Sequence, residues 1–187
     1  MTRGPAVIAV VNYDPTWPDR FEELERHYRS ALDGIAIVAV EHVGSTAVPG
    51  LAAKPVIDVD IVIRPADLAA TSAALLRLGY KARGEMGIEH RWAFLAPADV
   101  RATNTYVVIG GSVAHRNHIG VRDVLRTDTA LRKRYGDLKR RLAEEFDDID
   151  AYVAGKSALL SVILERAGLD AEERALITRA NALTNDG

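Results

Sequence analysis

Two aspartates and a Gly-Ser pair are the residues of this 187-residue chain best suited to carry out chemistry. Gly44 and Ser45 end one strand-like stretch, and Asp58 and Asp60 alternate with β-branched residues in the next. Because side chains alternate across a strand, both carboxylates point to one face and their neighbours to the core. Such carboxylates repel unless water, a base or a cation separates them, and Mg²⁺ binds one or two carboxylates together with phosphate. Nucleotidyl transfer is therefore the leading hypothesis.

The Gly-Ser pair supplies the phosphate half of this pattern. Gly44 lets the backbone approach a ligand without a Cβ, and Ser45 and Thr46 add hydroxyls beside free backbone amides. Each half also has a plainer interpretation, because an Asp-x-Asp strand can face solvent and a Gly-Ser pair can be an ordinary turn. Together they favour a corner that holds a triphosphate and Mg²⁺.

Size, charge and composition restrict the class of protein. With 48% hydrophobic residues and no Pro/Gly/Ser-rich linker, we expect one domain over residues 1–187, with a core at about 8–167 and a C-terminal helix and tail at 168–187. A net charge of −2 predicts no extended nucleic-acid binding and no membrane binding, so any phosphate site must be local. The absence of cysteine excludes disulfides and thiolate zinc sites. The first apolar run is too short for a signal peptide or membrane span, so we expect a cytoplasmic protein.

The hydrophobic pattern predicts an α/β (α+β) domain in which the strands come first. Strands are expected over residues 35–43, 56–63, 91–95 and 103–109. Helices are expected over about 15–33, 66–78, 119–126, 129–145, 149–167 and 171–183. These elements predict a mixed sheet with helices on one face, an open acidic cleft, and a helical C-terminal part that covers one side.

The motifs around these residues resemble the GrpB family. The resemblance covers roughly residues 11–166, and the stretches that carry it are Val11-x-Tyr13-Asp14-Pro15-x-Trp17-Pro18, Glu41-His42-Val43-Gly44-Ser45-Thr46-Ala47-Val48-Pro49-Gly50-Leu51, Lys54-Pro55-x-Ile57-Asp58-x-Asp60, Leu78-Gly79-Tyr80, His118 with Arg122-Asp123-x-Leu125-Arg126, Tyr135-x-x-Leu138-Lys139, and Tyr152-x-x-x-Lys156. The family is also similar to a domain joined to dephospho-CoA kinase in some actinobacteria, which hints at a link to coenzyme A metabolism.

The resemblance implies a nucleotidyltransferase-like fold of the DNA polymerase beta type. In that superfamily the Gly-Ser turn holds the triphosphate of the nucleotide and the paired aspartates bind the divalent metals. Carried over by position, Gly44 and Ser45 would hold phosphate, and Asp58 and Asp60 would hold Mg²⁺. Fold alone does not decide function.

One strand departs from the superfamily pattern. Active members supply a third carboxylate from a later strand, which acts as a base and metal ligand. The strand that could supply it here contains Asn104 and Tyr106 and no acidic residue, and neither matches the His-x-His that GrpB relatives tend to carry there. Asn104 could coordinate through its carbonyl oxygen, but it cannot accept a proton near neutral pH. This departure puts polymerase-like catalysis in doubt and strengthens the alternative of nucleotide binding without turnover, although the transferase stays the leading hypothesis.

The helical half adds basic candidates. Lys156 shares an apolar stripe with Tyr152. Either both close over the cleft, with the ammonium on phosphate and the phenol on a base or sugar, or Lys156 snorkels to solvent or pairs in an internal salt bridge. Arg122 and Arg126 lie on one helical face, where they could hold a phosphate or could be solvated. Lys54 precedes the aspartate strand, and it either neutralises phosphate or is a loop charge.

Three further residues are cleft candidates. Glu41 and His42 are adjacent on a strand, so at most one faces the cleft, and the pattern does not decide which. His118 could be a ligand, a general base or a structural residue at a helix start. The functional hypotheses are a Mg²⁺-dependent transferase acting from a nucleoside triphosphate on an unknown acceptor, a catalytically inert nucleotide- or phosphometabolite-binding regulatory module, and a structural interaction domain.

Overall fold

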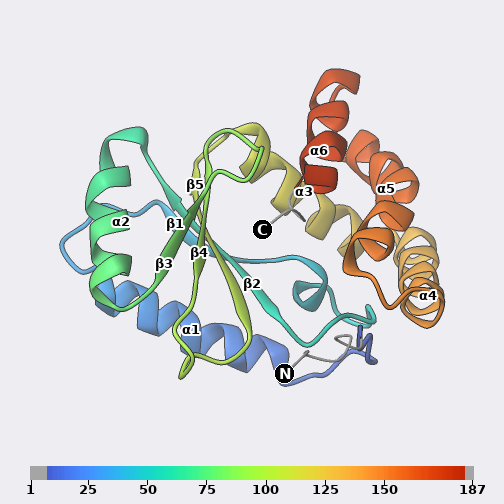
Figure 1. Cartoon of the computed structure of the whole chain (residues 1–187), viewed down its shortest axis with the longest axis horizontal. Coiled ribbons are helices and arrows are strands. Elements are labelled where there is room, and N and C mark those ends of the chain that lie inside the picture. The colour runs from blue at the N-terminus through green and yellow to red at the C-terminus, as the bar shows by residue number, and fades with distance from the viewer. Residues whose placement is uncertain (1–7, 184–187) are drawn as a thin grey trace.

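A computed structural model describes residues 8–183, in which a five-stranded mixed sheet is flanked by two helices on one side and four on the other (Figure 1). The elements in chain order are α1 (Trp17–Ala31), β1 (Ala39–Val43), β2 (Ile57–Ile63), α2 (Leu68–Arg77), β3 (Lys81–Gly84), β4 (Arg91–Leu95), β5 (Thr103–Ile109), α3 (Val113–Thr127), α4 (Thr129–Glu145), α5 (Ile149–Arg166) and α6 (Ala171–Leu183), with short 3₁₀ turns η1 (Ser45–Ala47) and η2 (Pro65–Asp67). Within residues 8–183, every helix is too short or too polar to cross a membrane.

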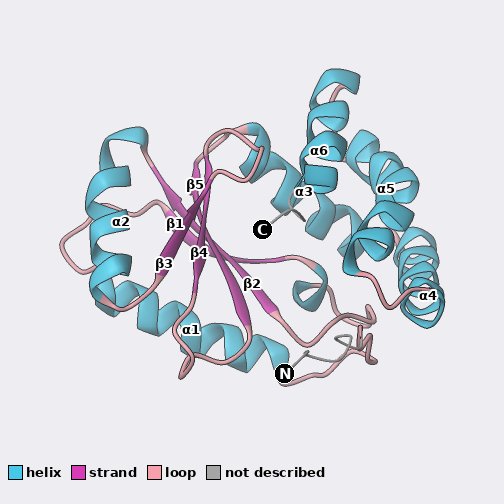
Figure 2. Cartoon of the chain, viewed as in Figure 1, coloured by secondary structure: helices cyan, strands magenta, loops and turns pink. Residues whose placement is uncertain are grey.

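The strand order β1-β2-β5-β4-β3 places the aspartate strand next to the centre of the sheet (Figure 2). β2 pairs parallel with β5, and the other neighbours pair antiparallel. The register sets Asp60 opposite Glu41 on one side and Tyr106 on the other, and it sets Asp58 opposite Asn104. Residues opposite one another in a ladder share a face, so all five side chains lie on the same face of the sheet.

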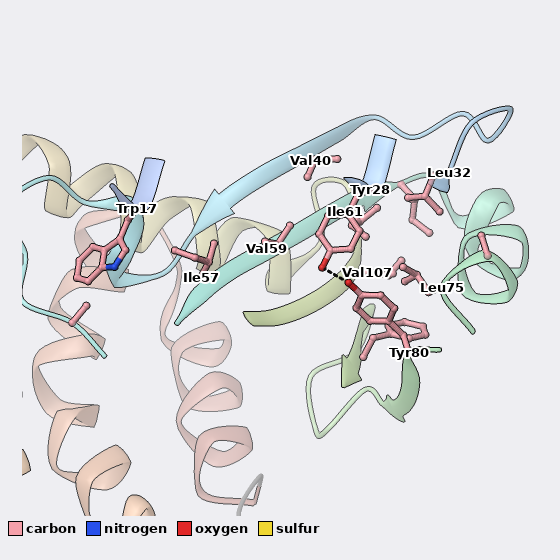
Figure 3. Packing of buried hydrophobic residues seen from close by; sticks show 14 residues of the cluster. Trp17, Tyr28, Leu32, Val40, Ile57, Val59, Ile61, Leu75, Tyr80 and Val107 are labelled. Carbon is pink, nitrogen blue, oxygen red and sulfur yellow. Dashed lines mark hydrogen bonds between the residues drawn. The ribbon is translucent and has the colours of Figure 1, made fainter. Parts of the chain in front are cut away.

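The opposite face of β2 carries the hydrophobic core. Val59 and Ile61 pack there with Tyr28 of α1 and Leu75 of α2 (Figure 3). Trp17 is fully buried in the same cluster, where it packs the first helix onto the sheet. The alternation of apolar and acidic residues in β2 therefore separates the core from the aspartate face.

Most predicted elements are present with small differences at their ends. Residues 91–95, 103–109, 129–145 and 171–183 match the predicted bounds. The first strand is shorter than predicted, because Ile37 N donates to Ile35 O in a local turn instead of to the sheet. The predicted helix over 119–126 begins earlier, at Val113, because the Ser112 side chain caps it by accepting from His115 N.

Strand β3 was missing from the prediction. It is an edge strand in which all four residues are exposed, so it carries no alternation of buried and exposed side chains. Its pairing with β4 is irregular between Ala82 and Gly84. Short, polar and irregular edge strands limit unwanted pairing with other chains, and the same properties hide them in a sequence.

We predict that Tyr28→Phe lowers the free energy of unfolding by about 1–2 kcal/mol, because two buried partners lose a hydrogen bond. The Tyr28 hydroxyl lies 2.7 Å from Thr105 Oγ1 and accepts from the Tyr80 hydroxyl at 3.0 Å, the latter bond drawn in Figure 3. Urea denaturation measures the change. Tyr13→Phe, outside this network, is the control, and equal stability of Tyr28→Phe and wild type would contradict the assignment.

Candidate functional site

A cavity of 320 Å³ lies between the aspartate face of the sheet and the helices α4, α5 and α6. It brings together eight residues that the sequence singled out: Ser45, Thr46, Lys54, Asp58, Asn104, Tyr106, Tyr152 and Lys156. The rest of its wall consists of Val56, Met86, Arg91, Lys139, Val153, Leu160 and Asn181. The cavity is therefore the place where the predicted phosphate turn and one of the two predicted metal ligands meet the helical half.

The turn at Gly44 lies directly over the carboxylate of Asp58. Gly44 has φ +70°, and a Cβ placed on it would lie 2.0 Å from Asp58 Oδ2, so no other residue fits this turn without a rearrangement. The other oxygen, Oδ1, accepts a hydrogen bond from Asn104 Nδ2 at 2.7 Å. Burial raises the pKa of the Asp58 carboxyl, and the Asn104 hydrogen bond opposes that shift.

Asp60 is fully buried beneath the cavity and is not part of its wall. Both of its oxygens lie 2.9 Å from Nδ1 of His118 on α3. A carboxylate can only accept, so His118 carries its proton on Nδ1 and donates it to Asp60. The two aspartates are thus held by different partners, Asn104 and His118.

A two-metal centre does not fit these residues. Glu41 shares the aspartate face, but its carboxylate accepts from Arg122 Nη1 at 2.7 Å. Among residues 8–183, no three His, Cys, Asp or Glu side chains form a group that could hold a metal ion. Of the described residues, only Asp58 offers a carboxylate to the cavity, which suits one Mg²⁺ brought by a ligand's phosphates, since Mg²⁺ often has one protein carboxylate.

Cations dominate the cavity wall, so the predicted acidic cleft is wrong. The described part of the wall carries one carboxylate, that of Asp58, and four cations, Lys54, Arg91, Lys139 and Lys156. Burial lowers the pKa of Lys139 to about 7 and that of Lys156 to about 8, and repulsion between neighbouring lysines adds to both shifts. An arrangement of this kind favours an anionic ligand.

Lys139 is the site residue that sequence reasoning missed. Only 2% of its surface is exposed, and its Nζ donates to Ser45 Oγ at 2.8 Å. The signal was present, because Lys139 follows Tyr135 by four positions and so shares the inward stripe of α4 with Leu131 and Leu142. The same pattern of a cation on an apolar stripe had predicted a site role for Lys156, but that rule was not applied to Lys139.

Aromatic rings support the charged side chains around the cavity. Lys54 Nζ and Lys156 Nζ lie 5.7 and 4.5 Å from the centre of the Tyr152 ring. The Arg91 guanidinium lies 5.2 Å from the Tyr106 ring. Arg91 is only 6% exposed, and its Nε has no hydrogen-bond partner among the described residues. The guanidinium therefore adds a buried positive charge to the cavity wall.

His42 lies on the core face of the sheet, away from the cavity. It stacks on Phe21 with ring centres 4.7 Å apart. Thr46 Oγ1 donates to Val56 O, so His42 Nε2, 3.0 Å away, must donate to Thr46 Oγ1. Burial, followed by repulsion from Arg126 and Arg122, lowers the pKa of His42 to about 4, so the ring is neutral at pH 7.

Arg122 and Arg126 of α3 are also outside the cavity. Arg122 donates to Glu41 and Asp123, and Arg126 Nε donates to Ala47 O at 2.9 Å. Of the adjacent pair at positions 41 and 42, Glu41 faces the aspartate side, yet neither residue lines the cavity. These contacts hold α3 against β1 and the η1 turn.

Comparison with known proteins gives consistent matches over most of the chain. The family model described as GrpB protein matches residues 7–166. A UPF0157 protein of Halalkalibacterium halodurans is 36% identical over 167 residues, which cover 87% of this chain and 83% of the relative. The crystal structure of conserved protein GrpB from Enterococcus faecalis aligns with a TM-score of 0.75 at 31% identity, covering 85% of this chain and 96% of that one.

Two longer relatives match over part of their length. A dephospho-CoA kinase of Mycolicibacterium paratuberculosis is 29% identical over 178 residues, which are 81% of this chain and 44% of the kinase. The UPF0157 protein YqkA of Bacillus subtilis is 31% identical over 162 residues, which are 86% of this chain and 47% of YqkA. The chain thus spans about half the length of these two relatives.

We predict that Lys139→Met raises the free energy of unfolding at neutral pH by about 1 kcal/mol, because it removes a buried charge that forms no salt bridge with a carboxylate of residues 8–183. The folded pKa of about 7 lies below the ordinary 10.5, so the unfolded chain binds more protons between these values and wild-type stability rises with pH from about 7 to 9. Urea denaturation across this range measures both effects. The rise in the free energy of unfolding with pH should be smaller in Lys139→Met than in wild type. An equal rise in both proteins would contradict the lowered pKa of Lys139.

Proposed function

This chain belongs to the GrpB family, and we propose that its cavity binds the phosphate groups of a nucleoside triphosphate or a related phosphorylated small molecule. The observation that carries the proposal is the contact between buried Lys139 and Ser45 on a wall with four cations and one carboxylate. Cations kept close together in a low-dielectric site repel one another, and a polyanion removes that repulsion.

The ligand's phosphates would lie between the η1 turn and α5. Ser45 and Lys139 approach them from one side, and Lys54 and Lys156 approach from the side of Tyr152. The two lysines beside the Tyr152 ring make it a support for cations rather than a platform for a base. Arg91 adds a fourth positive charge to the wall that would surround the ligand.

Mg²⁺-dependent nucleotidyl transfer is the second candidate. It is supported by the close approach of Gly44 to Asp58, which places a carboxylate beside the phosphate turn. Mg²⁺ would be held by Asp58 and the ligand's phosphates, and it would neutralise charge on the transferred group. Asn104 replaces the carboxylate that would complete such a site, so binding without turnover is the better-supported function.

A coenzyme A precursor belongs among the ligands to be tested. A dephospho-CoA kinase contains a segment similar to this chain, and dephospho-coenzyme A carries the diphosphate that the cationic wall would bind. We therefore include it beside the nucleotides, as a regulatory ligand of the inert module.

We predict that ATP, GTP, CTP, UTP or dephospho-coenzyme A raises the melting temperature, because a ligand that binds only the folded state stabilises it. The shift should fall from pH 7 to about 9 as the lysines lose their protons, with pKa values of about 7 and about 8 in the free protein. Lys156→Met should weaken binding about tenfold or more.

Lys133→Met is the matched control, because Lys133 is an exposed lysine of α4 that pairs with Asp137. It should leave the ligand-induced shift unchanged. No shift with any of the five compounds, with or without Mg²⁺, would contradict the proposed function.

We predict that Asn104→Asp creates a Mg²⁺ site that isothermal titration calorimetry detects, because it adds a carboxylate beside Asp58 Oδ1, now 2.7 Å from the amide nitrogen. Without metal, the two carboxylates should repel and lower the free energy of unfolding by about 1 kcal/mol. Asn104→Ala is the control that removes the hydrogen bond without adding charge. Equal Mg²⁺ affinity in wild type and Asn104→Asp would show that Asn104 does not limit metal binding.

A further inference from the structure

Ser45 and Lys139 form a pair of the kind that activates a serine hydroxyl. Lys139 Nζ lies 2.8 Å from Ser45 Oγ, and both residues line the 320 Å³ cavity. They come from elements far apart in the chain, the η1 turn and α4, so the contact depends on the fold. A nucleophile within hydrogen-bond reach of a base, in a cavity that admits a substrate, is the geometric requirement for covalent catalysis.

The surroundings of Lys139 suit a base. Its nitrogen is buried, and its other close contact is the Tyr135 ring at 4.9 Å. Lys156, Lys54 and Arg140 face it and lower its pKa in addition to burial, and Asp58 alone opposes them. A pKa of about 7 means that amine and ammonium forms coexist at neutral pH, as general base catalysis requires.

The neighbouring hydroxyl is not available for the same chemistry. Thr46 is 1% exposed, its Oγ1 donates to Val56 O, and it accepts from His42. These bonds fix the turn and leave Ser45 as the hydroxyl that faces Lys139. Thr46 is therefore a structural counterpart of Ser45 within the same turn.

We propose that Ser45 is a nucleophile and Lys139 its general base, and that Ser45 takes a phosphoryl or nucleotidyl group from a phosphoanhydride bound in the cavity. The proposal rests on the proposed phosphate-binding function. Ser45 Oγ forms a bond to phosphorus while the bridging P–O bond breaks, and the leaving phosphate, diphosphate or nucleotide keeps that electron pair. The hydroxyl proton moves to Lys139 Nζ. The product is a phosphate ester of Ser45.

The same wall would stabilise the charges that change in this step. Lys54 and Lys156 carry positive charge toward the leaving oxygens, and Lys139 gains positive charge when it takes the proton. In each case a positive lysine lies near the negative phosphate oxygens in a buried site, where the attraction between opposite charges is stronger than in water.

The test incubates the whole chain with ATP, with Mg²⁺ and with EDTA, and measures intact mass, the modified peptide and released phosphate or diphosphate. We expect one adduct on Ser45 that is absent from Ser45→Ala, with a rate that rises with pH through the titration of Lys139. A fluorophosphonate serves as a second probe, because it reports serine nucleophilicity without needing a phosphate site.

Lys139→Arg distinguishes the role of Lys139 as a general base from its role as a positive charge that binds phosphate. Arginine keeps the positive charge but does not accept a proton near neutral pH. ATP should still raise its melting temperature, and modification of Ser45 should fall at least about 100-fold. Lys133→Arg on the same helix is the control and should react like wild type. Thermal unfolding of each variant verifies that it is folded.

The outcomes separate the two proposals. If ATP raises the melting temperature but gives no adduct and no released phosphate or diphosphate, the inference is overturned and the proposed function stands. If ATP does not bind but the fluorophosphonate labels Ser45 in a Lys139-dependent way, the nucleophile is supported and the proposed ligand is wrong. Equal labelling of Lys139→Arg and wild type overturns the role of Lys139 as base.

Discussion

The close approach of the η1 turn to the Asp58 carboxylate is the constraint on which the site depends. The carboxylate occupies the space where a side chain at position 44 would be, so the backbone can pass over β2 only as glycine. Once the turn lies there, Ser45 reaches Lys139 and Thr46 reaches Val56 O. One steric condition at the end of β1 thus positions both hydroxyls of the turn.

The electrostatics of the cavity follow from the partners of Asp58 and Asp60. Asn104 binds one oxygen of Asp58, and His118 binds both oxygens of Asp60, so the two carboxylates have neutral or basic partners in place of a third carboxylate. The lysines of α4 and α5 then face a single carboxylate across the cavity. The balance of charge on the described cavity wall is therefore positive, which favours an anionic ligand over a free metal ion.

Much of the fold could be predicted because its signals are local. The alternation in β2 assigned Asp58 and Asp60 to one face, and the spacing of apolar residues located α4 and α6. The edge strand β3 lacks that alternation, so it was missed. The partners of His42 and Arg122 could not be predicted, because Phe21 and Glu41 come from other elements and only the packing of α1 and α3 brings them together.

The cost of burying Lys139 is the strongest argument that the cavity has a function. A buried ammonium next to other cations lowers the stability of the folded chain, and a hydrogen bond to Ser45 with a ring contact to Tyr135 offsets only part of that cost. A methionine of similar length would fill the same space without the penalty. Residues that break the usual rules of core packing, such as a buried lysine, tend to occur at functional sites, where a ligand or a reaction offsets their cost in stability. On this reasoning the anion of the proposed function would supply the charge that balances Lys139.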